Sequence, residues 1–119
     1  MTEKDTKCMI QFITENPSIS KKTIHNFLNW MDNTLYTTGC GYDPDVIFDR
    51  LEDETNIISH LSQRDRRKLY DVFVVISELA EYSFTWPELV SHDLWEHNII
   101  TKADLEEEGE TETDPQPFQ

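Results

Sequence analysis

Apolar residues recur every three or four positions along most of the chain, the spacing that gives an α-helix one buried face. Five such faces can be read in chain order: Cys8, Met9, Phe12 and Ile13; Ile24, Phe27, Leu28, Met31 and Leu35; Val46, Ile47 and Leu51; Leu69, Val72, Phe73, Ile76, Leu79 and Ala80; and Leu89, Val90 and Leu94. Helices that each hide one face need a shared interior. The pattern predicts a mainly α-helical fold, a compact single-domain bundle of about five helices.

Residues suited to cap a helix N-terminus precede four of the predicted helices and mark one further short turn: Ser20, Asp43, Ser62, Thr85 and Thr101. Such side chains accept hydrogen bonds from backbone N–H groups that have no partner inside the helix. Glu88 stands three residues after Thr85, the spacing of a capping box. We therefore expect helices to begin at these positions.

Residues 70–76 allow a second interpretation. Four β-branched residues lie in this stretch, which is typical of a buried strand. The flanking apolar residues keep helical spacing on both sides, which favours one long central helix.

The composition changes at Glu106. Residues 106–119 contain six acids, no base, two prolines and one large apolar residue, too little apolar surface to bury. The sequence therefore predicts a helical domain over residues 1–105 and a disordered acidic tail over residues 106–119.

Acidic residues outnumber basic ones by 24 to 10, which gives a net charge of −14. This balance excludes binding to nucleic acid or to an anionic membrane through bulk charge. Surface scaling gives one net charge per roughly 480 Å² of protein. A DNA duplex carries one charge per about 110 Å² of its surface. Only a local cluster of carboxylates can therefore approach the charge density of DNA.

Such a cluster lies in residues 43–54, where six acids face a single arginine. Four of these acids recur at spacings of four, three and one, which places them on one side of a helix. Charge repulsion along that row weakens an isolated helix by a few tenths of a kcal/mol per pair. The alternative is a solvated helix face that aids solubility. Together with the first acids of the tail, the predicted partner-binding residues are Asp43, Asp45, Asp49, Glu52, Asp53, Glu54, Glu106, Glu107 and Glu108.

A short basic cluster precedes the longest predicted helix and consists of Arg64, Arg66, Arg67 and Lys68. Cations are unfavourable at a helix N-terminus, because the helix dipole is positive there. The cluster is a candidate contact for phosphate or for the acidic tail. Its plain alternative is the exposed beginning of an amphipathic helix.

No motif in the sequence indicates catalysis or a bound cofactor. His92 and His97 are five residues apart, whereas a helical zinc site needs a spacing of four. Glycine-rich phosphate loops and serine nucleophile motifs are absent. We expect a protein that is not an enzyme and that holds no metal and no cofactor.

The cellular setting is expected to be the cytoplasm. The longest apolar run, residues 72–76, is far shorter than the roughly 18 residues that a membrane helix needs. The charged N-terminus argues against a secretory signal. Cys8 and Cys40 are too few to form a disulfide framework, so both are expected to be reduced, with Cys8 in the core.

In charge and size, the chain resembles the acidic DNA-mimic proteins with which phages block restriction or CRISPR systems. The resemblance rests on no motif and carries over no residue. It implies a non-catalytic inhibitor or adaptor whose carboxylates occupy a basic groove of a nucleic-acid-binding protein, with no direct contact to nucleic acid. Two alternatives are an immunity or antitoxin protein for a basic toxin, and a small helix-turn-helix regulator that uses residues 16–24 as its turn.

Overall fold

Six helices follow one another in the computed structural model, which describes residues 2–38 and 43–109, and the side chains of residues 4–35 and 43–106. They are α1 (Thr2–Glu15), α2 (Lys21–Thr38), α3 (Pro44–Glu54), α4 (Gln63–Leu79), α5 (Trp86–Glu96) and α6 (Lys102–Gly109). The described residues contain no strand. The predicted all-helical class is therefore confirmed, and residues 70–76 are helical, as part of α4.

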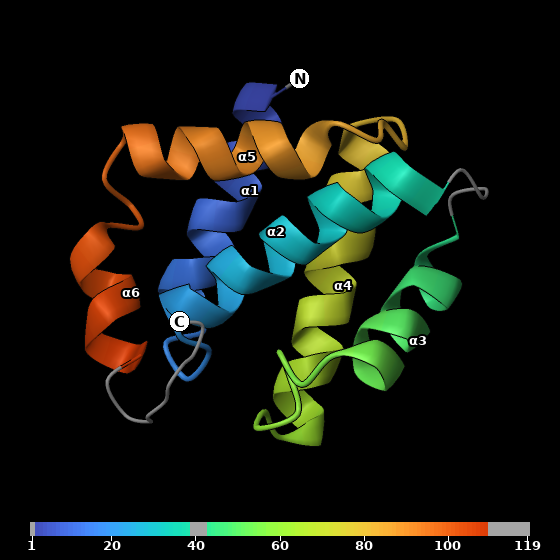
Figure 1. The fold of residues 1–119 in the computed structure, drawn as a ribbon. Helices are drawn as coiled ribbons and strands as arrows, with labels where there is room; N and C mark the ends of the chain where they lie inside the picture. The colour runs from blue at the N-terminus through green and yellow to red at the C-terminus, as the bar shows by residue number, and fades with distance from the viewer. Residues whose placement is uncertain (1, 39–42, 110–119) are drawn as a thin grey trace.

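The helices pack around α1, α2 and α4 (Figure 1). α5 lies across α1 and α2, α1 packs on α4, and α6 packs on α2. α3 contacts α4 at the edge of the molecule. This arrangement leaves two helix pairs with outward-facing seams, α3 beside α4 and α2 beside α5.

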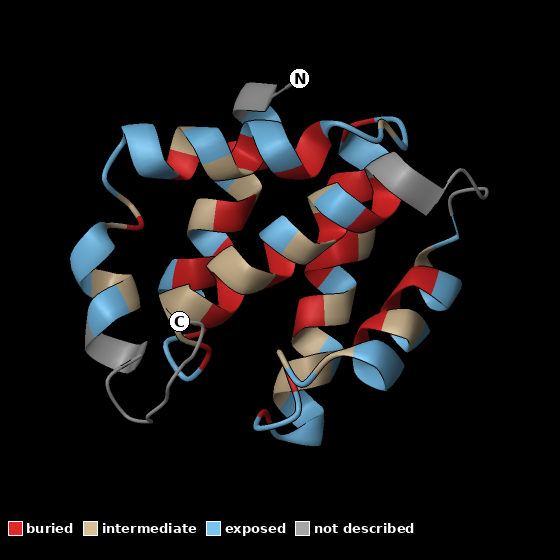
Figure 2. Cartoon of the chain, in the orientation of Figure 1, coloured by how far each residue is buried: buried red, intermediate tan, exposed pale blue. Residues whose placement is uncertain are grey.

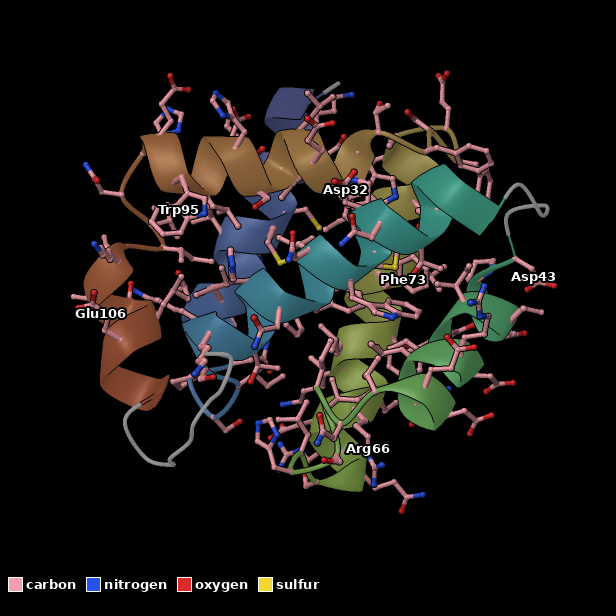
Figure 3. The ribbon with its side chains drawn as sticks, viewed as in Figure 1. Asp32, Asp43, Arg66, Phe73, Trp95 and Glu106 are labelled. Atoms are coloured by element: carbon pink, nitrogen blue, oxygen red, sulfur yellow. The ribbon has the colours of Figure 1, made fainter. Side chains whose placement is uncertain are left out.

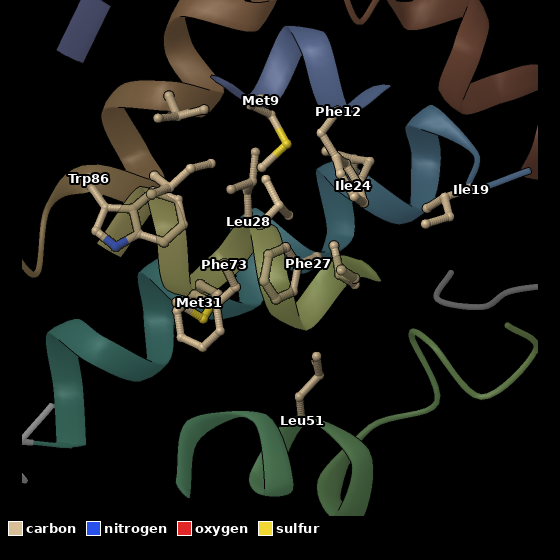
Figure 4. Close-up of a cluster of buried hydrophobic side chains, with 14 of the residues drawn as sticks. Met9, Phe12, Ile19, Ile24, Phe27, Leu28, Met31, Leu51, Phe73 and Trp86 are labelled. Atoms are coloured by element: carbon tan, nitrogen blue, oxygen red, sulfur yellow. The ribbon is translucent and has the colours of Figure 1, made fainter. Parts of the chain in front are cut away.

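The core is a single cluster of apolar side chains from all parts of the bundle (Figure 4). Phe73 of α4 is its hub, because its ring contacts Phe27 of α2, Phe48 of α3 and Trp86 at centroid distances of 6.0, 6.5 and 6.2 Å. Figure 2 shows the buried residues on the inner sides of the helices. One aromatic side chain thereby ties three other helices to α4.

Four of the five predicted N-caps form. Ser20, Asp43 and Ser62 accept backbone hydrogen bonds at 3.1, 3.0 and 3.1 Å. Thr101 and Asp104 form a reciprocal pair, with Asp104 Oδ2 accepting from the Thr101 N–H at 2.8 Å. These caps fix where α2, α3, α4 and α6 begin.

α5 begins directly after Thr85, as predicted, but the predicted capping box does not form. Thr85 already has a helical backbone conformation, with φ −98° and ψ −4°, and its side chain makes no capping hydrogen bond. Its own N–H instead donates to Ser83 Oγ at 3.2 Å. Glu88 is therefore exposed on the first turn of α5 and does not belong to a capping box.

Three residues of the predicted apolar faces are exposed: Val46, Leu79 and Leu89. In α3 the buried residues are Ile47, Phe48 and Leu51, because this side of the helix packs on α4 while Val46 faces solvent. Cys8 is a free thiol that is partly buried against the core, and Cys40 lies outside the described residues.

α6 continues through Gly109, four residues into the segment for which the sequence predicts disorder. The predicted boundary at residue 106 therefore falls inside a helix. Residues 110–119 of the predicted tail lie outside the described residues.

Candidate functional site

The acidic cluster of residues 43–54 forms the outer side of α3. Because this stretch is helical, the spacing of Asp45, Asp49, Glu52 and Asp53 confines them to an arc of about 100°. All four are exposed. We call these four residues the carboxylate face. Figure 3 shows side chains of α3 pointing away from the bundle, with Asp43 at its first turn.

Cations within the molecule engage only part of this acidic cluster. Arg50 Nε lies 3.0 Å from Glu54 Oε2 within α3 itself, and this hydrogen bond lowers the pKa of Glu54. Arg66 Nη1 of α4 lies 3.9 Å from Glu52 Oε2. One carboxylate at each of these places is therefore balanced by an arginine.

The other carboxylates of the cluster form no ion pair with any described residue. Asp43 caps the helix, and Asp45 accepts a hydrogen bond from the Tyr70 hydroxyl, which raises the pKa of that tyrosine. Asp49 and Asp53 make no ion pair and no hydrogen bond with any described residue. These last two carboxylates are free to meet an outside cation.

A hollow of about 370 Å³ separates the carboxylate face from α4. We call it the α3–α4 groove. Its lining includes Asp45, Phe48, Asp49, Glu52, Arg66 and Tyr70. The rings of Phe48 and Tyr70 meet edge to face at 5.3 Å. Arg67 lines the groove as well, so carboxylates from α3 face two arginines from α4 beside two aromatic rings.

The predicted basic cluster divides once α4 forms. Arg66 faces Glu52, whereas Arg67 Nε lies 3.5 Å from Asp71 Oδ1, one turn further along α4. Arg64 is exposed and pairs with no described residue. Lys68 turns toward a different hollow, which it shares with Cys8 and Glu15 of α1. Two of the four basic residues, Arg66 and Arg67, therefore form ion pairs within the molecule.

The acids of the predicted tail do not join the carboxylate face. Glu106 is exposed on α6, where its Oε2 lies 3.9 Å from Lys102 Nζ. Glu106 and Asp43 lie on opposite sides of the molecule (Figure 3). Glu107 and Glu108 continue the helix, and their side chains lie outside the described part.

A second acidic hollow, of about 300 Å³, lies between α2 and α5 and was not predicted from the sequence. We call it the α2–α5 groove. Its lining includes Leu28, Asp32, Pro87, Glu88, Leu89, His92 and Trp95, and no lysine or arginine among the described residues lines it. Burial and then the charge of Glu88 raise the pKa of Asp32. Two carboxylates that repel each other therefore share this groove.

The indole of Trp95 lies on the same seam and is 36% exposed. The ring of His25, on α2, meets it edge to face at 5.8 Å. Burial lowers the pKa of His25, which favours the neutral imidazole. Figure 3 shows Asp32 and Trp95 between α2 and α5, nearer opposite ends of α5.

Sequence spacing gives no signal for this second groove, because Asp32 and Glu88 meet only when α2 packs on α5. The sole local hint is Trp95, a large aromatic residue among the polar residues of the predicted fifth helix.

The histidines make ordinary contacts. His92 Nε2 lies 3.6 Å from Glu96 Oε1, and the Asp93 carboxylate accepts from the Thr6 hydroxyl at 3.0 Å.

Over residues 2–38 and 43–109, no three side chains with metal-binding atoms lie together. No helix in that part combines the length and the apolar character required to cross a bilayer.

Similarity to known proteins adds nothing to this picture. The sequence matches no protein-family model, no curated protein and no solved structure.

Proposed function

We propose that this chain is a cytoplasmic, non-catalytic binding protein whose carboxylate face occupies a basic groove on a nucleic-acid-binding protein. It acts there as an inhibitor or an adaptor. In physical terms, the carboxylates of α3 take the place of phosphates against lysine and arginine side chains of the partner.

The observation that carries the proposal is the position of Asp49 and Asp53. Both are exposed on a helix at the edge of the bundle, and neither is paired with a described residue. α3 is anchored to α4 by Phe48, which is buried against the rings of Tyr70 and Phe73. A rigid row of charges loses little conformational freedom on binding and speeds the encounter with an oppositely charged surface.

The helix-turn-helix alternative gains no support from the fold. In that interpretation α2 reads base edges, with His25, Asn26 and Asn29 as its polar residues. α2 is packed beneath α5 and α6, and the His25 ring lies against Trp95. Of these three polar residues only Asn29 is exposed, so this face of α2 offers little to base edges.

The proposal is tested by capture from a lysate of the source cells at two salt concentrations, followed by identification of the retained protein. The test variant reverses the carboxylate face by four substitutions to lysine, at Asp45, Asp49, Glu52 and Asp53. We expect this variant to lose the retained protein while its helical circular dichroism is unchanged, because the four side chains are exposed.

A matched control reverses four exposed acids elsewhere, at Glu15, Glu78, Glu81 and Glu96, and has the same net charge. Equal loss of binding in both variants contradicts a specific role for α3. Competition by duplex DNA for the captured protein separates a DNA mimic from an immunity protein, because only the mimic shares its site with DNA.

A further inference from the structure

We infer that the α2–α5 groove is a second contact site, which binds an amphipathic helix of the partner by taking up an arginine side chain between Asp32 and Glu88 and an apolar side chain against Leu89 and Trp95. The inference rests on the proposed function, because it takes the partner to be basic.

The charge of the groove selects a cation. Asp32 belongs to α2 and Glu88 to α5, so two separate helices bring their carboxylates to one hollow. No described lysine or arginine lines the groove to balance them. A guanidinium satisfies two carboxylates at once, since it is planar and offers five N–H donors, whereas an ammonium is a point charge.

The apolar part of the groove favours an apolar side chain of the partner near that cation. Leu89 and Trp95 are 43% and 36% exposed, although both belong to the seam that Leu28 and Pro87 close from below. Trp95 is held by the edge-to-face contact with His25, so its indole is already in place. Exposed tryptophans of this kind often carry a large share of binding energy at an interface.

The dimensions fit a helix. Glu88 and Trp95 are seven residues apart on α5, which is two turns or about 10.5 Å along the axis. A partner helix that lies along the seam presents its arginine and an apolar residue at the same spacing, on one face. This is the helix-in-groove mode of recognition, in which anchors recur at whole turns.

The test uses the full chain and two synthetic helical peptides. One carries an arginine and a leucine seven residues apart, and the other has citrulline in place of the arginine, which keeps the shape but removes the charge. Affinities are measured by titration calorimetry and tryptophan fluorescence in about 150 mM salt, where charges beyond roughly 8 Å are screened. We expect the arginine peptide to bind at least ten times more tightly than the citrulline peptide.

The variants then assign the two halves of the groove. D32N combined with E88Q should remove the tenfold preference for arginine, whereas Trp95→Ala should weaken both peptides. Circular dichroism checks that the double variant is folded, as expected because removal of the Asp32 charge relieves repulsion. E78Q combined with E81Q, two exposed acids that line neither groove, removes the same charge and should leave both affinities unchanged. D49N combined with D53N tests whether the arginine of the peptide pairs with the carboxylate face instead.

Three results overturn the inference: no binding of the arginine peptide at about 1 mM, an equal affinity for the citrulline peptide, or a preference that depends on Asp49 and Asp53 in place of Asp32 and Glu88. Failure here leaves the proposed function standing if reversal of the carboxylate face still abolishes capture of the partner. Failure of that capture test with a positive result here leaves the groove as the only contact site.

Discussion

The α3–α4 groove and the α2–α5 groove are both lined by carboxylates, but the fold treats them in opposite ways. In the first, Arg66 faces Glu52 and Tyr70 donates to Asp45, so part of the negative charge is compensated from α4. In the second, Asp32 and Glu88 have no arginine or lysine beside them among the described lining residues. The acid row that is obvious in the sequence is thus the better neutralised of the two.

This difference shows that a count of acids does not locate an electronegative surface. A charge acts outward only where the fold leaves it without an internal partner, and that depends on which helices pack together. On α3 the condition holds for Asp49 and Asp53; in the α2–α5 groove it holds for the pair Asp32 and Glu88. Surface ion pairs contribute little to stability, so the unequal treatment bears on binding more than on folding.

The largest expected effect on stability concerns the packing of α3 on α4. Phe48→Ala should lower the free energy of unfolding by about 3–5 kcal/mol, because it removes a buried ring that packs on Tyr70 and Phe73. Denaturant titration measures the loss. Val46→Ala, on the exposed side of the same helix, should change the free energy by less than about 0.5 kcal/mol.

Similar losses in the free energy of unfolding for Phe48→Ala and Val46→Ala contradict this prediction. In that case α3 is not docked through Phe48, and its carboxylates do not form the preorganised row on which the proposed function depends.

Five of the six helices and most of the core could be predicted from the sequence, because helical spacing and caps are local signals. Asp43 and Ser62 cap as expected, since each needs only a backbone N–H two or three residues away. The Thr85 side chain does not cap; its hydroxyl lies 2.9 Å from Ser83 Oγ in the preceding turn. Glu81 and Tyr82 in this turn adopt left-handed φ values of 57° and 59°. Residues other than glycine seldom adopt this conformation, so the sequence gives no sign of the turn.

The charge environment could not be predicted to the same degree. That four acids share a face follows from helical spacing alone, whereas the pairing of Glu52 with Arg66 requires α3 to lie beside α4. The meeting of Asp32 with Glu88 likewise requires α2 to lie beside α5. Long-range packing decides both, and no spacing in the chain encodes it.

The second prediction removes the compensating cation. Arg66→Met should make the α3–α4 groove more negative and raise the association rate with a lysine-rich peptide several-fold at low salt, up to about tenfold, because steering depends on local potential. Stopped-flow fluorescence measures the rate. Arg64→Met, which removes an exposed arginine that pairs with no described residue, is the matched control for net charge.

A rise that is equal for the two variants attributes the effect to overall charge. A larger rise for Arg66→Met shows that the internal pairing with Glu52 masks part of the carboxylate face.

The third prediction concerns the hydrogen bond across the α3–α4 groove. Tyr70→Phe removes the hydroxyl that donates to Asp45 and should lower the free energy of unfolding by about 0.5–1.5 kcal/mol, the usual net value of one such bond. The ring contacts with Phe48 and Phe73 remain. Ultraviolet titration of wild type should place the Tyr70 pKa above that of an ordinary tyrosine, because Asp45 holds the protonated form.

No change in stability from Tyr70→Phe, together with an ordinary titration, contradicts a direct bond between α4 and the carboxylate face. Asp45 then belongs with Asp49 and Asp53 among the uncompensated acids.

The smallest effects are the most discriminating, because they should differ in sign between the two grooves. Asp32→Asn should raise the free energy of unfolding at pH 7 by roughly 0.5 kcal/mol, the scale of a single surface substitution, since it removes a partly desolvated charge that Glu88 repels. Glu52→Gln should lower it by about 0.2–1 kcal/mol, since it removes the ion pair with Arg66. Thermal and denaturant unfolding at several pH values measure both.

The pH dependence fixes the sign. Burial and Glu88 raise the pKa of Asp32 above its ordinary 3.8, so the folded state holds this proton more tightly than the unfolded state. Stability from this group is complete below pH 3.8 and is lost as pH rises through the folded pKa. The advantage of Asp32→Asn should therefore vanish in acid and reach its full size near neutrality. If Asp32→Asn stabilises the protein equally in acid, the charge of Asp32 is not destabilised in the folded state. The α2–α5 groove then lacks the two mutually repelling carboxylates that distinguish it from the α3–α4 groove.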